Sequence, residues 1–152
     1  MKLISLLERL EYTCLQGSTE QEVKNVIYDS RKVEEGSLFI CIRGAVVDGH
    51  KFVPDVIAKG AKVLVVEEAV EAPEDVTVIL VKDSRYAMAF ISAAYFGYPA
   101  EKLKTIGITG TKGKTTTTYM VKSILENAGY KVGLIGTIEA IIGDKVIPAK
   151  NT

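Results

Sequence analysis

The sequence has few cysteines, no surplus of charge and no long apolar run. Cysteine occurs only at Cys14 and Cys41 in 152 residues, outside any CxxC or Cys/His spacing, which excludes a disulfide scaffold and a cysteine-rich metal site. We expect both thiols to be reduced and buried in the core. Lysine plus arginine equals aspartate plus glutamate, at 19 each, so net charge favours neither nucleic acid nor an acidic membrane as a partner.

No apolar stretch approaches the roughly 18 residues that a membrane-spanning helix needs. The first residues, MKLISLLERLEYTCL, are interrupted by charges and no small-residue cleavage site follows them, which is not typical of a signal peptide. We therefore expect a cytoplasmic protein without a membrane partner. An apolar content of 47% is too high for a disordered chain and indicates a globular protein.

The apolar spacing predicts alternating strands and helices, and therefore an α/β fold with a parallel sheet. Val63 to Val66 is an unalternating apolar run, typical of a strand that is covered on both faces. The predicted helices span residues 1–12, 52–59, 84–96 and 115–128. The predicted strands span residues 26–28, 38–42, 63–66, 78–81, 105–108 and 132–135, and a hairpin is expected over 141–146.

The segment GYPAEKLK, residues 97–104, is the best candidate for a domain boundary. A helix has just ended there, a proline prevents its continuation, and a new strand-loop-helix unit follows. We predict a domain over residues 1–98, a linker over 99–104, and the first part of a second, truncated domain over 105–152. A lone β-α-β segment leaves sheet edges open, which favours a chain that is the front part of something longer.

The strongest chemical signal is the loop TGTKGKTTT, which follows an apolar strand and opens a helix. Glycines let backbone N–H groups approach a polyphosphate, and the helix N-terminus favours its negative charge. Lys114 is the candidate catalytic residue, placed to reach the β- and γ-phosphates, and the Thr115 hydroxyl is the candidate Mg²⁺ ligand. The strict GxxxxGK[ST] spacing would require glycine where Ile108 stands. A glycine-rich turn with an incidental lysine is the alternative.

This loop resembles the ATP loop of the Mur ligases, the ATP-dependent amide-forming enzymes of peptidoglycan precursor synthesis. Lys112 stands where the family more often has Asn. The segments YDSR, GSLF and GAVVDGHKF, at residues 28–31, 36–39 and 44–52, are similar to the DSR…G-LF and GxxxDGHxF patterns of the family's N-terminal domain. The pairs GT at 136–137 and NT at 151–152, with VIP at 146–148, resemble the members that add the third residue of the peptide.

The resemblance implies an α/β UDP-sugar-binding domain followed by the start of a P-loop-type parallel-sheet ATP-binding domain. ATP would phosphorylate the D-Glu γ-carboxylate of UDP-MurNAc-L-Ala-D-Glu, and the amine of a diamino acid, meso-diaminopimelate or L-lysine, would attack the acyl phosphate. The match assigns ATP to Gly110, Thr111, Lys112, Gly113, Lys114, Thr115 and Thr116. It assigns the UDP-MurNAc substrate to Tyr28, Ser30, Ala45, Val46, Val47, Asn151 and Thr152.

Some of these residues have simpler structural explanations. Ser30 in Asp-Ser-Arg could cap a turn, and Arg31 could pair with a nearby carboxylate. His50, which is the only histidine and follows a turn, is expected to be structural rather than catalytic. A set of aromatic residues is expected to pack in a helix core or between domains rather than to stack on a ligand. These residues are Tyr86, Phe90, Tyr95 and Phe96.

Three other functions remain open at this point. The first is the Mur ligase that adds the terminal D-Ala-D-Ala dipeptide, and the second is a P-loop kinase or synthetase of unrelated chemistry. The third is a non-catalytic UDP-sugar-binding module, which would be indifferent to Lys114→Ala. We expect a monomer that is inactive alone, because the resemblance implies further phosphate and metal ligands and an amino-acid-selecting domain beyond this segment.

Overall fold

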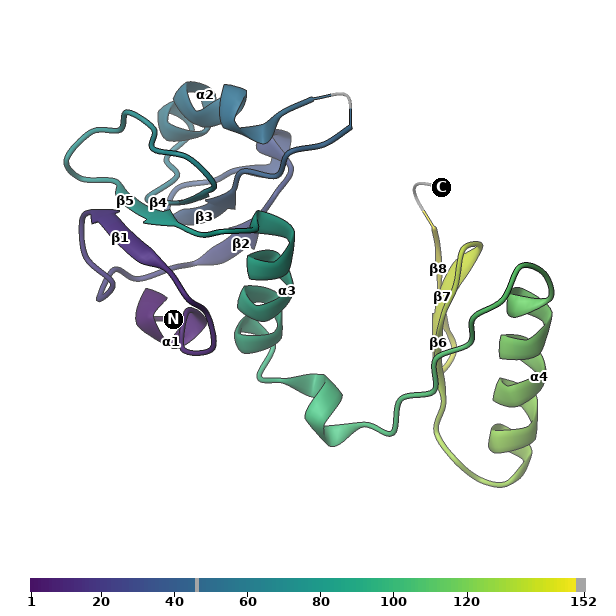
Figure 1. Cartoon of the computed structure of the whole chain (residues 1–152). Helices are drawn as coiled ribbons and strands as arrows, with labels where there is room; N and C mark the ends of the chain where they lie inside the picture. The colour runs from purple at the N-terminus through teal and green to yellow at the C-terminus, as the bar shows by residue number, and fades with distance from the viewer. Residues whose placement is uncertain (46, 150–152) are drawn as a thin grey trace. The chain divides into compact units, whose positions relative to one another are not determined.

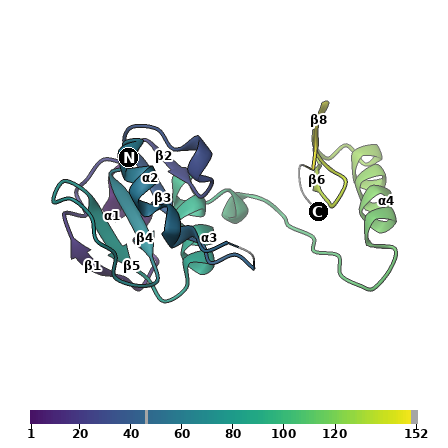
Figure 2. The same cartoon turned by 90° about the horizontal axis from the view of Figure 1, so that it is seen from above.

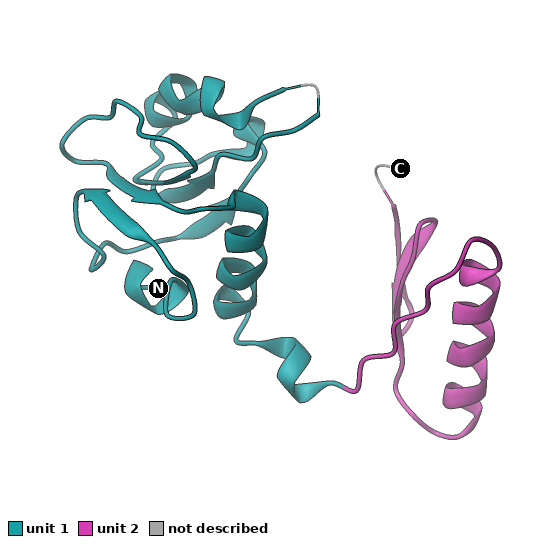
Figure 3. Ribbon diagram, viewed as in Figure 1, with its two compact units in different colours: residues 1–103 teal, residues 104–152 magenta. Residues whose placement is uncertain are grey.

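The structure, a computed structural model, describes residues 1–45 and 47–149. The chain forms two compact units, residues 1–103 and residues 104–152, which Figure 3 shows in different colours. The predicted contact residues Val46, Asn151 and Thr152 lie outside the described residues. None of the helices in the described part is both long and apolar enough to cross a membrane.

Unit 1 is built on a five-stranded sheet with the order β1-β5-β4-β3-β2 (Figure 1). The four strands β2 to β5 run parallel, as the sequence predicts, and β1 joins the edge of β5 in the antiparallel direction. The strands are β1 (Thr13–Gln16), β2 (Asn25–Ile27), β3 (Ser37–Ile40), β4 (Val63–Val66) and β5 (Thr77–Leu80).

Helices cover both faces of this sheet (Figures 1 and 2). Alternate residues of β4 point to opposite faces, so Val63 and Val65 join one apolar cluster while Leu64 and Val66 join the other. All of them are buried, which confirms the prediction of a strand covered on both sides. The first cluster includes α1 (Leu3–Leu6) and α3 (Ser84–Tyr95), and the second includes α2 (Val53–Ala58).

Helix α3 begins and ends where the sequence predicts. Asp83 is its N-cap, and one carboxylate oxygen accepts the backbone N–H groups of Arg85 at 2.8 Å and Tyr86 at 2.9 Å. Gly97 follows the helix with a φ of 70°, a conformation that glycine adopts without strain. Short 3-10 helices complete unit 1, namely η1 (Ser30–Lys32), η2 (Gly49–Phe52) and η3 (Pro99–Lys102).

The N-terminal segment differs from the prediction of a helix over residues 1–12. Only Leu3–Leu6 is α-helical, because the chain must turn back to form β1, an edge strand that the sequence pattern did not predict. The side chain of Cys14 lies exposed on β1, so the expectation that both thiols are buried is wrong for Cys14 and confirmed for Cys41.

Two of the four aromatic residues, Tyr86 and Phe96, do not pack in the expected helix core, whereas Tyr95 packs against the first apolar cluster. Tyr86 and Phe96 are 57% and 72% exposed, and the Tyr86 ring contacts the Phe90 ring in a tilted arrangement with centroids 4.6 Å apart. Helix α3 buries small and aliphatic residues instead. The residues that it buries are Ser84, Ala87, Ile91 and Ala94.

Unit 2 combines α4 (Lys114–Asn127) with an antiparallel sheet of order β6-β7-β8. The strands are β6 (Gly133–Ile135), β7 (Glu139–Ile142) and β8 (Lys145–Pro148). The predicted hairpin is confirmed, with Gly143 at a φ of 57° in its turn. Helix α4 matches the predicted helix within one residue at each end.

The parallel pairing expected in unit 2 does not form in the described residues. Residues 105–108 form no strand, and β6 pairs with β7 in the antiparallel direction instead. A β-strand requires backbone hydrogen bonds to an adjacent strand, and no strand in the described part of the chain pairs with residues 105–108. Leu134 is the only buried apolar side chain among the described residues of this unit.

Candidate functional site

The glycine-rich loop of unit 2 is closed by its own lysine. The ammonium of Lys114, the first residue of α4, donates to the Gly110 carbonyl oxygen at 2.5 Å. Gly110 and Gly113 have φ angles of 148° and 76°, which side-chain-bearing residues rarely adopt. The loop therefore needs glycine at both positions to bring Lys114 back over its own backbone.

The loop and the first turn of α4 form a surface suited to an anion. Gly113 is the N-cap and provides no side-chain cap, and the first turn contains no acidic residue. The first N–H groups of a helix lack partners within the helix and carry partial positive charge. Lys112 and Lys114 are exposed beside them, and Thr115 is half-buried. The predicted ATP residues 110–116 are therefore contiguous along the loop and the first turn of α4, an arrangement that favours an anion.

The predicted UDP-sugar residues gather at one edge of the unit 1 sheet. Tyr28 and Ser30 directly follow β2, while Ala45 and Val47 lie in the loop after β3. Because β2 and β3 run parallel, these four residues lie beyond the carboxyl ends of adjacent strands. Ligands of open α/β sheets bind beyond this edge. Tyr28, Ala45 and Val47 are exposed there.

Asp29, rather than Ser30, organises the turn after β2. Its carboxylate accepts the backbone N–H of Arg31 at 3.1 Å and pairs with the Arg31 guanidinium at 2.8 Å. These hydrogen bonds, led by that of the guanidinium, lower the pKa of Asp29 to about 2. The alternative in which Ser30 provides the cap is therefore wrong, and the pairing predicted for Arg31 is confirmed. The Ser30 carbonyl accepts the Lys59 ammonium at 3.0 Å.

Backbone hydrogen bonds close the loop after β3. The N–H of Gly49 donates to the Ile42 carbonyl and that of Gly44 to the Val47 carbonyl, both at 2.9 Å. A Cβ at Gly49 would lie 2.6 Å from the Ile42 nitrogen, so only glycine permits this closure. We refer to residues 42–45 and 47–50 as the β3 loop.

His50 anchors the β3 loop to the end of β4. Its Nδ1 lies 2.6 Å from the Asp48 carboxylate, and its Nε2 accepts the backbone N–H of Glu67 at 3.0 Å. Since Nε2 is an acceptor, the ring proton resides on Nδ1. Both ring nitrogens are engaged and the side chain is buried, which confirms the structural role predicted for this histidine.

Arg43 lies among three carboxylates at the same edge, an arrangement that the sequence did not reveal. Its guanidinium meets Glu68 at 2.5 Å, Asp48 at 3.5 Å and Glu67 at 3.7 Å. Glu67 also accepts the backbone N–H and the hydroxyl of Ser84 at 2.8 and 2.7 Å. Hydrogen bonds from Ser84, followed by the charge of Arg43, lower the pKa of Glu67. The only sequence signal is a charged residue after each of two apolar strands.

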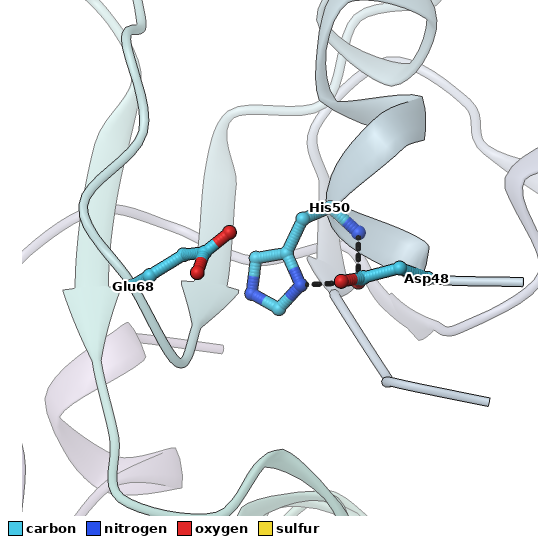
Figure 4. A group of neighbouring side chains, drawn as sticks. All are labelled: Asp48, His50 and Glu68. Carbon is cyan, nitrogen blue, oxygen red and sulfur yellow. Dashed lines mark hydrogen bonds and ion pairs between the residues drawn. The ribbon is translucent and has the colours of Figure 1, made fainter. Parts of the chain in front are cut away.

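Asp48, His50 and Glu68 come close enough to suggest a metal site, with ligand atoms within 4.8 Å of one another. In Figure 4 the His50 ring lies between the two carboxylates. A metal would have to displace an existing partner, because His50 uses both nitrogens and Glu68 pairs with Arg43. Neutral imidazole can ligate a metal only through a free ring nitrogen, so we assign this group to structure.

Known proteins are similar to this chain across both units. Residues 22–96 match the family described as "Mur ligase family, catalytic domain", and residues 108–152 match the "Mur ligase middle domain". The chain belongs to the Mur ligase family. Within the family, it is 53% identical over 152 residues to the UDP-N-acetylmuramoyl-L-alanyl-D-glutamate–2,6-diaminopimelate ligase of Clostridium perfringens, and 50% identical over 155 residues to that of Clostridium tetani.

This Mur ligase chain spans about a third of the length of those relatives. Each alignment covers 100% of this chain, but only 31% of the Clostridium perfringens ligase and 32% of the Clostridium tetani ligase. A solved structure of UDP-N-acetylmuramoyl-L-alanyl-D-glutamate–2,6-diaminopimelate ligase matches the whole chain at a TM-score of 0.75 and 21% identity, which shows the common fold. The Acinetobacter baumannii D-alanyl-D-alanyl-adding ligase matches 83% of this chain and 28% of its own, with a TM-score of 0.65 and 32% identity.

Proposed function

We propose that this chain is the N-terminal part of an ATP-dependent ligase that joins diaminopimelate to UDP-MurNAc-L-Ala-D-Glu. The observation that carries the proposal is the identity of 46% to 53% along the whole chain to relatives that all bear this ligase name. The names of these relatives favour diaminopimelate over L-lysine, a choice that the residues alone leave open. Because the proposed substrates are water-soluble nucleotides, a cytoplasmic reaction is part of the same proposal.

ATP binding is the proposed role of unit 2. Residues 110–116 would surround the phosphates with backbone N–H groups, and the Lys114 ammonium would leave the Gly110 carbonyl to neutralise the charge that develops during transfer. The Thr115 hydroxyl is an oxygen ligand of the kind that Mg²⁺ prefers, and it lies in the first turn of α4, which contains no acidic residue. Mg²⁺ would supply charge neutralisation between the phosphates.

The proposed chemistry proceeds in two balanced steps. An oxygen of the D-Glu γ-carboxylate attacks the γ-phosphorus of ATP, the bond to the bridging oxygen breaks, and ADP leaves. The diaminopimelate amine then attacks the acyl carbon, inorganic phosphate leaves with the electron pair, and the nitrogen loses a proton. The first step depends on positioning of the reactants and on neutralisation of their charge, and a glycine-rich loop with a lysine can provide both.

Binding the uridine nucleotide is the proposed role of unit 1. Tyr28, Ser30, Ala45 and Val47 lie beyond the carboxyl ends of β2 and β3, where ligands of open α/β sheets bind. Val46, Asn151 and Thr152 remain proposed contacts from the family resemblance. The loop after β3 would contact the nucleotide through its backbone, because alanine and valine side chains offer no hydrogen bonds.

The dipeptide-adding ligase is the second candidate, because its Acinetobacter baumannii member has a similar fold at 32% identity. That match covers 83% of this chain, whereas the diaminopimelate ligase of Clostridium perfringens covers all of it at 53% identity. The comparison therefore favours the diaminopimelate ligase. A monomer remains our proposal for the chain as it stands.

Calorimetric titration tests the proposal with this chain as it is. We expect saturable binding of UDP-MurNAc-L-Ala-D-Glu, little response to UDP-glucose, and weaker binding of Mg·ATP in Lys114→Ala by roughly tenfold or more, since the ammonium provides a charge-assisted bond. Lys122→Ala is the matched control, because Lys122 lies on the same helix and, within the described part of the chain, forms its ion pair with Glu126.

Each outcome selects one function. ATP binding without any preference for the muramyl nucleotide would identify an unrelated P-loop enzyme. Binding of the muramyl nucleotide with equal Mg·ATP heats in Lys114→Ala and the unmutated chain would identify a non-catalytic nucleotide-sugar module. Tighter binding of the muramyl tripeptide nucleotide than of the dipeptide nucleotide would favour the dipeptide-adding ligase.

A further inference from the structure

The charged residues around the β3 loop form a network that none of the proposed ligand contacts explains. Arg43 and Asp48 lie near opposite ends of the loop, and their backbones form an antiparallel bridge across it. Glu67 and Glu68 directly follow β4, the neighbouring strand. Both ends of the β3 loop are thereby tied to the end of another strand, while Ala45 and Val47 between them are exposed.

We infer that Arg43 is a positioning residue for nucleotide binding, which acts by fixing the β3 loop to the carboxyl end of β4 through Glu68 and Glu67. The inference rests on the proposed UDP-sugar site. A single exposed ion pair holds its partners weakly. Arg43, however, meets three carboxylates, and its own carbonyl accepts the Arg85 guanidinium at 3.2 Å.

The geometry explains why such a residue is needed here. The loop carries glycine at positions 44 and 49, and glycine loses more conformational freedom on ordering than other residues. A loop that binds through its backbone gains affinity when it is ordered before the ligand arrives. The buried His50 ring fixes one end of the loop to the Glu67 N–H, and Arg43 fixes the other end to Glu68.

Arg43 could also act merely as a positive charge near an anionic ligand, and the two roles predict opposite effects of Glu68→Ala. If Arg43 acts through Glu68, removing the carboxylate frees the loop and weakens binding. If the net charge alone matters, removing a negative charge tightens binding of a diphosphate or leaves it unchanged. This sign difference makes Glu68→Ala the decisive variant.

The experiment measures binding of UDP-MurNAc-L-Ala-D-Glu to the whole chain by calorimetry. We expect Arg43→Ala and Glu68→Ala each to raise the Kd by roughly tenfold, and the double variant to bind no more weakly than Arg43→Ala alone, because Glu68 acts through Arg43. Binding of Mg·ATP is expected to stay unchanged. Arg43→Lys is expected to recover part of the affinity, since it keeps the charge but not the planar fork.

A matched ion pair at the opposite edge of the same sheet provides the controls. Lys62 and Asp75 precede β4 and β5 and pair at 2.5 Å. Lys62→Ala and Asp75→Ala each remove one charge and one ion pair from unit 1, and we expect both to leave the Kd for the nucleotide unchanged. A Kd that rises equally in these controls would show general destabilisation and overturn the inference.

Amide hydrogen exchange gives a readout that needs no ligand. The N–H groups of Gly44 and Gly49 close the β3 loop, so we expect them to exchange faster in Arg43→Ala and Glu68→Ala while the amides of β4 remain protected. Unchanged exchange at both glycines, or tighter nucleotide binding by Glu68→Ala, would overturn the inference. If the unmutated chain binds no muramyl nucleotide, the proposed function fails. Faster exchange of the Gly44 and Gly49 amides in the two variants would then still show that Arg43 and Glu68 hold the β3 loop in place.

Discussion

At the scale of single residues, the two cysteines lie in opposite environments. Burial in the sheet core, and next the negative charge of Asp48, raise the pKa of Cys41 to about 12, whereas Cys14 is exposed on the edge strand β1. Only the thiolate reacts readily with disulfide reagents. We therefore expect an aromatic disulfide reagent at pH 8 to titrate one thiol in the native chain and two in denaturant. Cys14→Ser should abolish the native reaction, and rapid labelling of Cys41 would contradict the structure.

The position of the glycine-rich loop before α4 could be predicted because it depends on residues that are neighbours in sequence. Gly110, Gly113 and Lys114 lie close together in sequence at the start of α4, so the Lys114 ammonium reaches the Gly110 carbonyl without any distant part of the chain. The surroundings of Arg43 could not be foreseen, because Glu67 and Glu68 are more than twenty residues away in sequence. Strand pairing between β3 and β4 brings them together.

At the scale of elements, the cap of α3 contributes measurably to the stability of unit 1. The Asp83 carboxylate satisfies two N–H groups that would otherwise lack a partner. We expect Asp83→Ala to lower the free energy of unfolding by about 1 kcal/mol, and a chemical denaturation curve would measure the loss. Asp83→Asn should retain most of the stability, since an amide oxygen also caps, and equal stability of the Ala variant would contradict the assigned cap.

Helices were predicted better than edge strands, for a physical reason. Helices α3 and α4 depend on hydrogen bonds within a dozen or so consecutive residues and on the residues that cap them. The strand β1 and the strand expected over 105–108 depend on a partner elsewhere. The short N-terminal helix α1 illustrates the same point. It ends at Leu6, and the chain then continues into β1, which pairs with the distant strand β5.

At the scale of the whole molecule, the two units differ in how much apolar surface they bury. Both apolar clusters lie within residues 1–103. Among the described residues of unit 2, Leu134 alone is buried, while Ile135, Ile138 and Ile142 are exposed. Because burial of apolar surface drives folding, we expect residues 1–103 alone to unfold cooperatively at nearly the same temperature as the whole chain. A molten fragment, or a large drop in melting temperature, would contradict this division of stability.

The sequence by itself determined the elements that arise from neighbouring residues, and tertiary structure decided the rest. The buried parallel strands, the helices with caps, the glycine-rich loop and the Gly143 turn all follow from local periodicity and local chemistry. Tertiary structure decided the exposure of Cys14, the antiparallel pairing of β6 with β7, and the placement of Arg43 among carboxylates from the β3 loop and from the residues that follow β4. Hydrogen bonds between strands and charges that meet across a sheet edge depend on distance in space, which no local pattern encodes.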